Sequence, residues 1–290
     1  MRVNLGSFVA RWMTVFLMVL PTSLAEAQET AQQQDAVRTD RVRYVLSAPA
    51  DPAHRYIHGR LERRNVLERI SKFLSPFRLP RDVVILVQSC DGDVNAYYEN
   101  ATIVICYEYL AYIDAHAPSG WYEDGVRRRD AIIGPTIDLF LHEMGHAVFD
   151  LLKIPVLGRE EDAADLFAAY IQLQADREDA LALISGITFL GLKETREAMA
   201  TNLELKHFAK EHGLPGQRYF NVLCVAYGFD PKLFADAVSR WNLPPERAES
   251  CALEYVQIDH AFKTLIAPHL DMALFDEVRS KKLLRFWPSQ

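Results

Sequence analysis

The residues with the clearest chemical meaning in this 290-residue chain are His142-Glu143-Met144-Gly145-His146. On a helix, residues four apart stand one turn apart on nearly the same face, so two imidazole rings can reach one metal ion. The Glu143 carboxylate is close enough to take a proton from a water molecule that the metal polarises. The pentapeptide therefore predicts a metal site with His142 and His146 as ligands and Glu143 as the general base.

The flanking sequence predicts that this pentapeptide lies on a buried helix. Apolar residues recur around it at helical spacing, namely Ile137, Phe140, Leu141, Met144, Val148 and Leu151. Buried imidazoles and carboxylates are costly without partners, and a metal ion supplies them. The alternative is an amphipathic helix whose histidines fall in register without a ligand. A glycine at position 145 inside the helix costs about 1 kcal/mol relative to alanine. Close approach of the backbone to the metal, or core packing, would explain why glycine is present there.

The H-E-x-x-H spacing is the signature of zinc metallopeptidases, so Zn2+ is the expected cofactor. The metzincin extension requires Gly and His where this chain has Phe149 and Leu152. That class is therefore excluded.

Downstream, the spacing of Glu161 and Asp165 resembles the second helix of gluzincins. This resemblance implies that Glu161 is the third zinc ligand and that Asp165 hydrogen-bonds the other ring nitrogen of His142. Glu160 or Asp162 is the alternative ligand, since acidic residues also favour the first turn of any helix.

A peptidase also needs a hydrogen-bond donor for the oxyanion that forms during hydrolysis. His212 and Arg218 are the first candidates for this catalytic role, followed by His207 and Tyr219. Arg218 could equally form a structural ion pair with a carboxylate.

Ahead of the helices, the sequence predicts a strand at Val83–Gln88 and a hairpin of Val94–Tyr98 with Thr102–Cys106. Leu61–Leu74 is predicted to form a helix, and the chain from Asp130 onward is almost wholly helical in pattern. The hairpin residues Asn95, Ala96 and Tyr97 are the predicted edge strand that pairs with an extended substrate. A disulfide-tied hairpin that touches no substrate is the equal alternative.

The first 27 residues have the pattern of a signal peptide. Arg2 and Arg11 precede the apolar run Trp12–Leu20, and Ala25-Glu26-Ala27 is a small-residue cleavage site. The sequence predicts an exported chain, periplasmic or extracellular, with no stable membrane insertion once the signal is removed. An uncleaved anchor is the alternative. Residues 28–40 are polar and predicted to be a flexible lead-in, followed by a single domain over 41–290.

Export changes how the four cysteines are interpreted, since an even number in an oxidising compartment favours disulfides. Three pairings are open for Cys90, Cys106, Cys224 and Cys251, and the local pairs Cys90–Cys106 and Cys224–Cys251 are favoured. The formal net charge is −7 and the basic clusters are short, which argues against nucleic acid as a partner. The sequence leaves the oligomeric state open.

Taken in order, these motifs resemble a bacterial family of exported metallopeptidases catalogued as a domain of unknown function. The resemblance covers roughly residues 40 to 260 and is carried by Cys90, Asn95–Tyr98, Ile105–Glu108, Leu141–His146, Gly158–Asp165, Gln217–Asn221, Cys224 and Tyr227-Gly228. It implies a gluzincin-type zinc peptidase fold with two disulfides, and it does not imply a substrate.

The predicted fold class is therefore α+β and zincin-like. A small, mostly antiparallel sheet with an edge hairpin packs on the H-E-x-x-H helix. The sheet-bearing part extends to about residue 130, and a mainly helical part follows over 131–290. The predicted function is hydrolysis of peptide bonds in peptides or proteins by a zinc-activated water. The alternatives are a zinc hydrolase acting on another bond and a zinc-stabilised binding protein without turnover.

Overall fold

The computed structural model describes residues 41–281 and residue 284, all of which belong to one compact unit that begins at Asp40. The predicted signal peptide and lead-in lie outside the described residues.

The strands are β1 (Val42–Leu46), β2 (Val83–Gln88), β3 (Ala96–Glu99), β4 (Thr102–Cys106), β5 (Tyr122–Glu123) and β6 (Val126–Arg127). The helices are α2 (Arg55–Arg63), α3 (Val66–Leu74), α4 (Tyr107–His116), α5 (Arg128–Leu152), α6 (Glu160–Leu173), α7 (Arg177–Ala200), α8 (Pro215–Phe229), α9 (Asp236–Ser239), α10 (Pro245–Leu265) and α11 (Met272–Ser280). Short 3-10 helices are η1 (Pro52–His54), η2 (Leu205–Ala209) and η3 (Ala267–His269).

The main sheet has four strands in the order β1-β2-β4-β3. Strands β1, β2 and β4 are parallel, and β3 alone runs antiparallel to its neighbour β4. The prediction of a mostly antiparallel sheet is therefore wrong, and the sheet is mixed. The physical reason is the crossover through α2 and α3, which returns the chain to place β2 parallel to β1. The sequence pattern does not predict strand β1.

The other predicted elements differ from the structure in smaller ways. Strand β2 has the predicted bounds, and β3 and β4 form the predicted hairpin through Asn100 and Ala101, which have φ of 50° and 61°. The helix predicted over Leu61–Leu74 is split into α2 and α3. Asn65 has φ of 49° at the split, and asparagine enters this left-handed region more readily than most residues.

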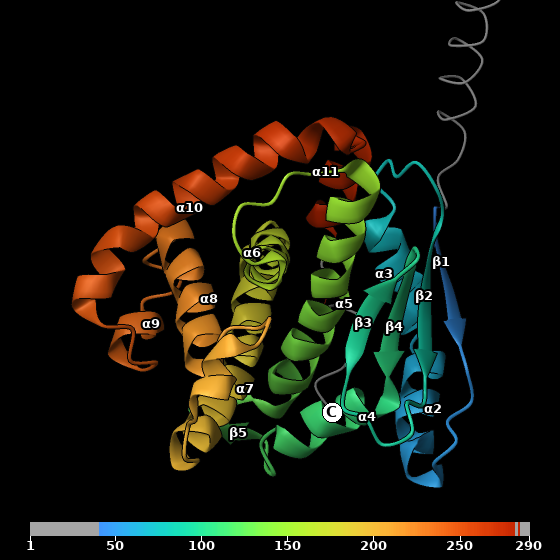
Figure 1. Cartoon of the computed structure of the whole chain (residues 1–290), viewed down its shortest axis with the longest axis horizontal. Helices are drawn as coiled ribbons and strands as arrows, with labels where there is room; N and C mark the ends of the chain where they lie inside the picture. The colour runs from blue at the N-terminus through green and yellow to red at the C-terminus, as the bar shows by residue number, and fades with distance from the viewer. Residues whose placement is uncertain (1–40, 282–283, 285–290) are drawn as a thin grey trace, which may run out of the picture. The chain divides into compact units, whose positions relative to one another are not determined.

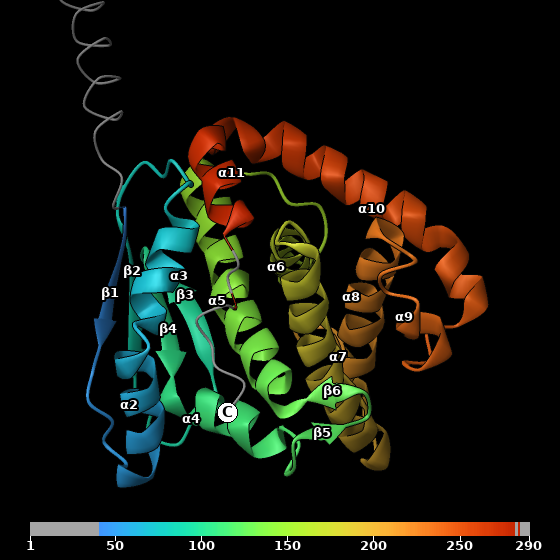
Figure 2. The same cartoon turned by 180° about the vertical axis from the view of Figure 1, so that it is seen from behind.

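Helix α5 joins the sheet to the helical part. It packs on β3 and β4 and also on α6 and α7, while α8 packs on α7 and α10 (Figure 1). Figure 2 shows the same order from behind, with α2 and α3 beside the sheet and α10 crossing the end of α8. None of the described helices has the length and apolar character needed to cross a membrane.

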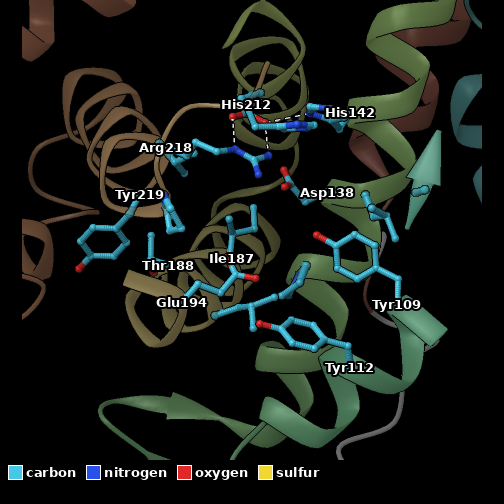
Figure 3. Close-up of a pocket in the computed structure, with 18 of the residues that line it drawn as sticks. Tyr109, Tyr112, Asp138, His142, Ile187, Thr188, Glu194, His212, Arg218 and Tyr219 are labelled. Atoms are coloured by element: carbon cyan, nitrogen blue, oxygen red, sulfur yellow. Dashed lines mark hydrogen bonds and ion pairs between the residues drawn. The ribbon is translucent and has the colours of Figure 1, made fainter. Parts of the chain in front are cut away.

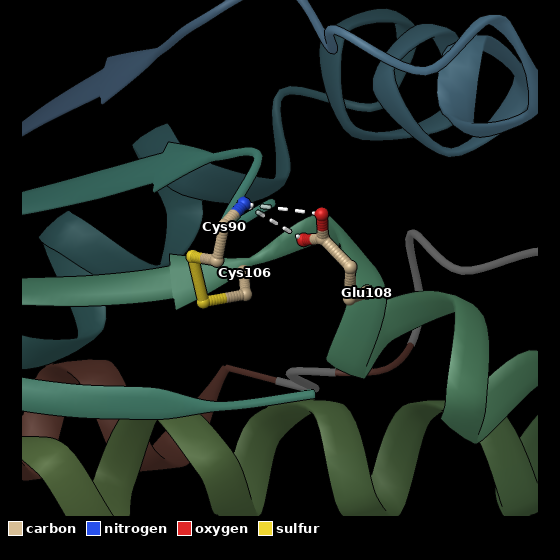
Figure 4. A group of neighbouring side chains, drawn as sticks. All are labelled: Cys90, Cys106 and Glu108. Carbon is tan, nitrogen blue, oxygen red and sulfur yellow. Dashed lines mark hydrogen bonds between the residues drawn. A yellow bond between two sulfur atoms is a disulfide. The ribbon is translucent and has the colours of Figure 1, made fainter. Parts of the chain in front are cut away.

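Two disulfides join elements on either side of α5. Cys90 pairs with Cys106 at the end of β4, and Cys224 of α8 pairs with Cys251 of α10. These are the two local pairs favoured by the sequence. At the first disulfide, the Glu108 carboxylate accepts a hydrogen bond from the Cys90 backbone N–H at 3.1 Å (Figure 4). Because both sulfur atoms are in the disulfide, this group has no thiolate to offer a metal.

Candidate metal centre

Helices α5 and α6 bring the predicted metal-site residues together. Helix α5 ends at Leu152, where Lys153 takes a left-handed conformation with φ of 55°. The chain then turns through Gly158, whose φ is +104°, and α6 packs alongside α5. A Cβ at Gly145 would lie 3.3 Å from the Ala164 Cα atom. Gly145 therefore lets α5 and α6 approach closely, which supports the packing explanation for this residue.

Three side-chain donors from these helices converge on one point. The Nε2 atoms of His142 and His146 are 3.2 Å apart. The Glu161 Oε2 atom is 3.0 Å from the first of these nitrogens and 3.5 Å from the second. The spacing of these three donors tests which metal ion they would fit.

The spacing fits zinc. Tetrahedral zinc with ligand bonds of about 2.0–2.1 Å places neighbouring ligand atoms roughly 3.3 Å apart. The separations of 3.0, 3.2 and 3.5 Å lie around this value. Two imidazole nitrogens and one carboxylate oxygen are also donors that zinc accepts in catalytic sites.

The other nitrogen of each imidazole is held by a carboxylate. The Nδ1 atom of His142 lies 2.8 Å from Asp165 Oδ1, the contact that the gluzincin resemblance implied. The Nδ1 atom of His146 lies 2.8 Å from Glu160 Oε1. Each carboxylate fixes its ring and tautomer so that Nε2 points at the shared centre. Glu160, an alternative ligand in the sequence analysis, thus lies behind an imidazole.

No sequence signal distinguished Glu160 for this position. It belongs to an acidic first turn with Glu161 and Asp162, and such turns are common because the helix dipole favours them. Its contact with His146 depends on how α6 packs on α5, which spacing within α6 does not specify.

Arg218 reaches the site from α8, and its guanidinium binds Asp165. The Nε and Nη2 atoms donate to Oδ2 and Oδ1 of that carboxylate, each at 2.7 Å. Burial alone would raise the pKa of Asp165, but the bonds from Arg218 and His142 outweigh it and hold the pKa below its usual range. This bidentate pair favours the ion-pair alternative for Arg218 over an oxyanion role.

His212 lies in the segment between η2 and α8. Its Nε2 atom is 2.7 Å from Glu161 Oε2, and its ring stacks on the His142 ring with centroids 5.8 Å apart. The side chain is 48% exposed, so it borders both the metal centre and solvent.

His207 and Tyr219, the second pair of candidates for the oxyanion donor, form hydrogen bonds with backbone groups. The Nδ1 atom of His207 accepts a hydrogen bond from the Glu204 backbone N–H. The Tyr219 hydroxyl donates to the Trp241 carbonyl at 2.5 Å. The Tyr219 hydroxyl is therefore directed at a backbone carbonyl and not at the shared centre.

Glu143 is buried beside the candidate metal centre, with 4% of its surface exposed. Burial raises the pKa of its carboxyl, opposed by the nearby His142 and His146. A carboxylate with a raised pKa is a better proton acceptor near neutral pH than an ordinary surface glutamate.

A groove of about 570 Å³ runs from the metal centre to the sheet edge. Its walls include Asn95, Ala96, Tyr97, Tyr98, His142, Glu143, His146, Arg159, Glu160, Glu161, Glu211 and His212. Strand β3 is the outermost strand of the sheet, so its outer edge has no strand neighbour within the described part of the chain. The predicted edge-strand residues and the predicted metal ligands thus line the same groove.

A second, more enclosed cavity of about 350 Å³, here called the inner cavity, begins at His142 and Glu143 and extends among α4, α5, α7 and α8 (Figure 3). Its lining includes Tyr109, Tyr112, Asp138, Leu139, Asp165, Thr188, Leu190, Glu194 and Arg218. The sequence does not indicate this cavity, because its lining comes from five separate helices, α4 to α8.

Comparison with known protein families finds one family that matches this chain. The family described as "Putative metallopeptidase" matches residues 46–266. Comparison with curated proteins and with solved structures gave no match.

Proposed function

Because the chain belongs to the "Putative metallopeptidase" family, we propose that it is an exported zinc peptidase that hydrolyses bonds in peptides or proteins. The observation that carries this proposal is the convergence of His142, His146 and Glu161 beside the buried Glu143 carboxylate. In this proposal His142, His146 and Glu161 hold zinc. Glu143 acts as the general base, which a closed structural site would not need.

When bound, zinc supplies a Lewis acid that makes water a stronger nucleophile at neutral pH and polarises the scissile carbonyl. Glu143 accepts the proton from the attacking water and then delivers it to the leaving amine. His212 donates a hydrogen bond to the oxygen that gains charge. Asp165 and Glu160 hold the two imidazole rings, and Arg218 acts by positioning Asp165.

The groove gives a path for the substrate backbone. An extended peptide would add to the free edge of β3 at Asn95, Ala96 and Tyr97, where backbone hydrogen bonds hold it without regard to sequence. The same groove contains the metal centre, so a peptide paired with β3 has its scissile bond within reach of Glu143.

The test is cleavage of a mixed peptide library by the zinc-loaded chain with both disulfides formed, beside Glu143→Gln. We expect cleavage by the parent chain and a loss of at least a thousandfold in kcat for the variant, with zinc content unchanged. Equal cleavage by both proteins would exclude Glu143 as the base. N-terminal sequencing of the exported chain tests the proposed cleavage after Ala27.

A zinc-stabilised protein without turnover is the second candidate, and His212 is the observation that favours it. As a fourth ligand, its Nε2 atom would complete a closed tetrahedral site. X-ray absorption of the zinc-loaded chain and of His212→Ala distinguishes the two cases. A closed site loses one nitrogen ligand in the variant, whereas a catalytic site keeps three protein ligands in both proteins.

A further inference from the structure

The inner cavity carries more negative charge than its own basic residues neutralise. Four carboxylates line it, those of Asp138, Glu143, Asp165 and Glu194. Arg218 is the only lysine or arginine among the lining residues of this cavity. It donates two hydrogen bonds of 2.7 Å, both to the Asp165 carboxylate.

The side chains that donate hydrogen bonds to Asp138 and Glu194 are neutral. Asp138 accepts a hydrogen bond from the Gln172 side-chain amide at 2.8 Å, through one of its two oxygens. Glu194 accepts one from the Tyr112 hydroxyl. Within the described residues, neither carboxylate forms an ion pair. Burial raises the pKa of both groups, that of Asp138 to about 6, and the nearby charges of Arg218 and the neighbouring histidines oppose this only in part.

The walls around these carboxylates suit a long, partly apolar side chain. Tyr109 and Tyr112 project from α4, facing Ile187 and Glu194 of α7, with Asp138 nearer His142 (Figure 3). Leu139 and Leu190 add aliphatic surface. Lysine and arginine have apolar stems that pack on such surfaces and cationic ends that pair with carboxylates and aromatic faces.

The cavity begins beside the proposed base, which places its occupant next to the reacting bond. We propose that the inner cavity is the subsite for a lysine or arginine side chain adjacent to the scissile bond, with Asp138 and Glu194 as specificity-determining residues. This inference rests on the proposed peptidase function, and it adds the substrate class: peptides with a basic residue at the cleavage point.

The first experiment measures binding without turnover. N-acetyl-arginine amide and N-acetyl-citrulline amide have nearly the same shape and differ in side-chain charge. Calorimetry on the zinc-loaded Glu143→Gln chain should show at least tenfold tighter binding of the arginine compound. Adding Asp138→Asn or Glu194→Gln should remove most of that preference. Glu249→Gln, an exposed carboxylate on α10, should keep it. Equal binding of the two compounds, or a preference that survives both cavity variants, overturns the proposal.

The second experiment measures cleavage, so that the two proposals fail separately. In the peptide library, the parent chain should prefer Lys or Arg beside the scissile bond. Each cavity variant should lower kcat/KM for those peptides about tenfold relative to kcat/KM for neutral peptides. Cleavage without basic preference, together with equal binding of the two amides, rejects the subsite and keeps the peptidase. Charge-dependent binding without any cleavage keeps the subsite and rejects the peptidase.

Discussion

At the residue scale, the proposed zinc ligands depend on carboxylates that do not themselves reach the shared centre. Asp165 holds His142 Nδ1 and is in turn held by two bonds from Arg218. A carboxylate behind a ligating imidazole raises its basicity and fixes its orientation. The metal affinity of this chain should therefore respond to residues outside the ligand set.

Asp165→Asn tests this dependence. The amide keeps the shape of the side chain but loses the charge that pairs with Arg218, so we expect zinc affinity to fall about 10- to 100-fold. Competition with a chromophoric chelator measures the change. Asp162→Asn is the matched control, because Asp162 lies on the same helix and pairs with Arg159. An unchanged affinity in Asp165→Asn would contradict the orienting role.

Asp138 provides a prediction about pH. Burial raises the pKa of its carboxyl from about 4 in the unfolded chain to about 6. The folded state therefore binds this proton more tightly than the unfolded state does. Ionisation of the buried Asp138 carboxyl therefore lowers the free energy of unfolding. This loss is absent below pH 4, grows between pH 4 and pH 6, and reaches about 3 kcal/mol above pH 6.

Asp138→Asn removes this penalty. The variant should match the parent near pH 4 and be more stable by up to about 3 kcal/mol at pH 8. Urea unfolding of both metal-free proteins at the two pH values measures the difference in stability. Contributions from other titrating groups are the same in both proteins and cancel in this difference. A variant that is less stable than the parent at pH 8 would show that a cation already compensates Asp138 in the folded chain.

Helical spacing predicts that His142 and His146 share one face of α5, and the resemblance to gluzincins implies that Glu161 and Asp165 of α6 lie beside them. The structure brings these four side chains within hydrogen-bond distance of one another. Arg218 is a different case. It is 53 residues from Asp165 in the chain, and only the packing of α8 selects that partner over other carboxylates.

At the element scale, the position of the metal helix depends on a close crossing between α5 and α7. A Cβ at Gly134 would lie 2.3 Å from the Leu183 carbonyl oxygen. A Cβ at Gly186 would lie 2.0 Å from the Asp130 carbonyl oxygen. Both contacts are with backbone atoms, which cannot rotate away as a side chain can. The two glycines therefore set how near α7 lies to the helix that carries the proposed ligands.

Gly186→Ala should force these helices apart. Although alanine is the better helix former, overpacking against backbone costs about 1–3 kcal/mol or more, so we expect a net loss of stability. Chemical denaturation measures it. Gly120→Ala is the control, since a Cβ there meets no atom within 4 Å. Equal stability of the two variants would mean that the crossing relaxes without cost.

The sheet shows why its topology was harder to predict than its strands. An apolar run such as β2 identifies a buried strand, and two runs joined by a short turn identify a hairpin. Neither pattern gives the direction of the next strand across the sheet. That direction depends on β1, in which three successive residues, Arg43, Tyr44 and Val45, are exposed, so the alternation typical of a half-buried strand is missing.

At the scale of the whole molecule, the proposed metal centre joins segments that are otherwise separate. The proposed ligands come from α5 and α6, and His212, from the segment before α8, contacts the ligand Glu161. One disulfide lies beside the groove-lining hairpin, and the other holds α8 to α10. Neither disulfide ties α6 to α5, so a bound ion would be the strongest single link between those helices.

Zinc removal should therefore lower the thermal stability of the chain. A ligand at a thousand times its Kd stabilises the folded state by about 4 kcal/mol, which corresponds to roughly 8–16 °C in Tm for a domain of this size. Chelation with both disulfides intact should produce such a fall. Added zinc should reverse it, and magnesium, which prefers octahedral oxygen ligands, should not. Glu161→Gln should melt near the metal-free temperature and respond little to chelator. A parent chain whose Tm is unchanged after verified zinc removal would show that packing of α5 on α6, through Gly145 and its alanine neighbours, holds the centre together without the ion.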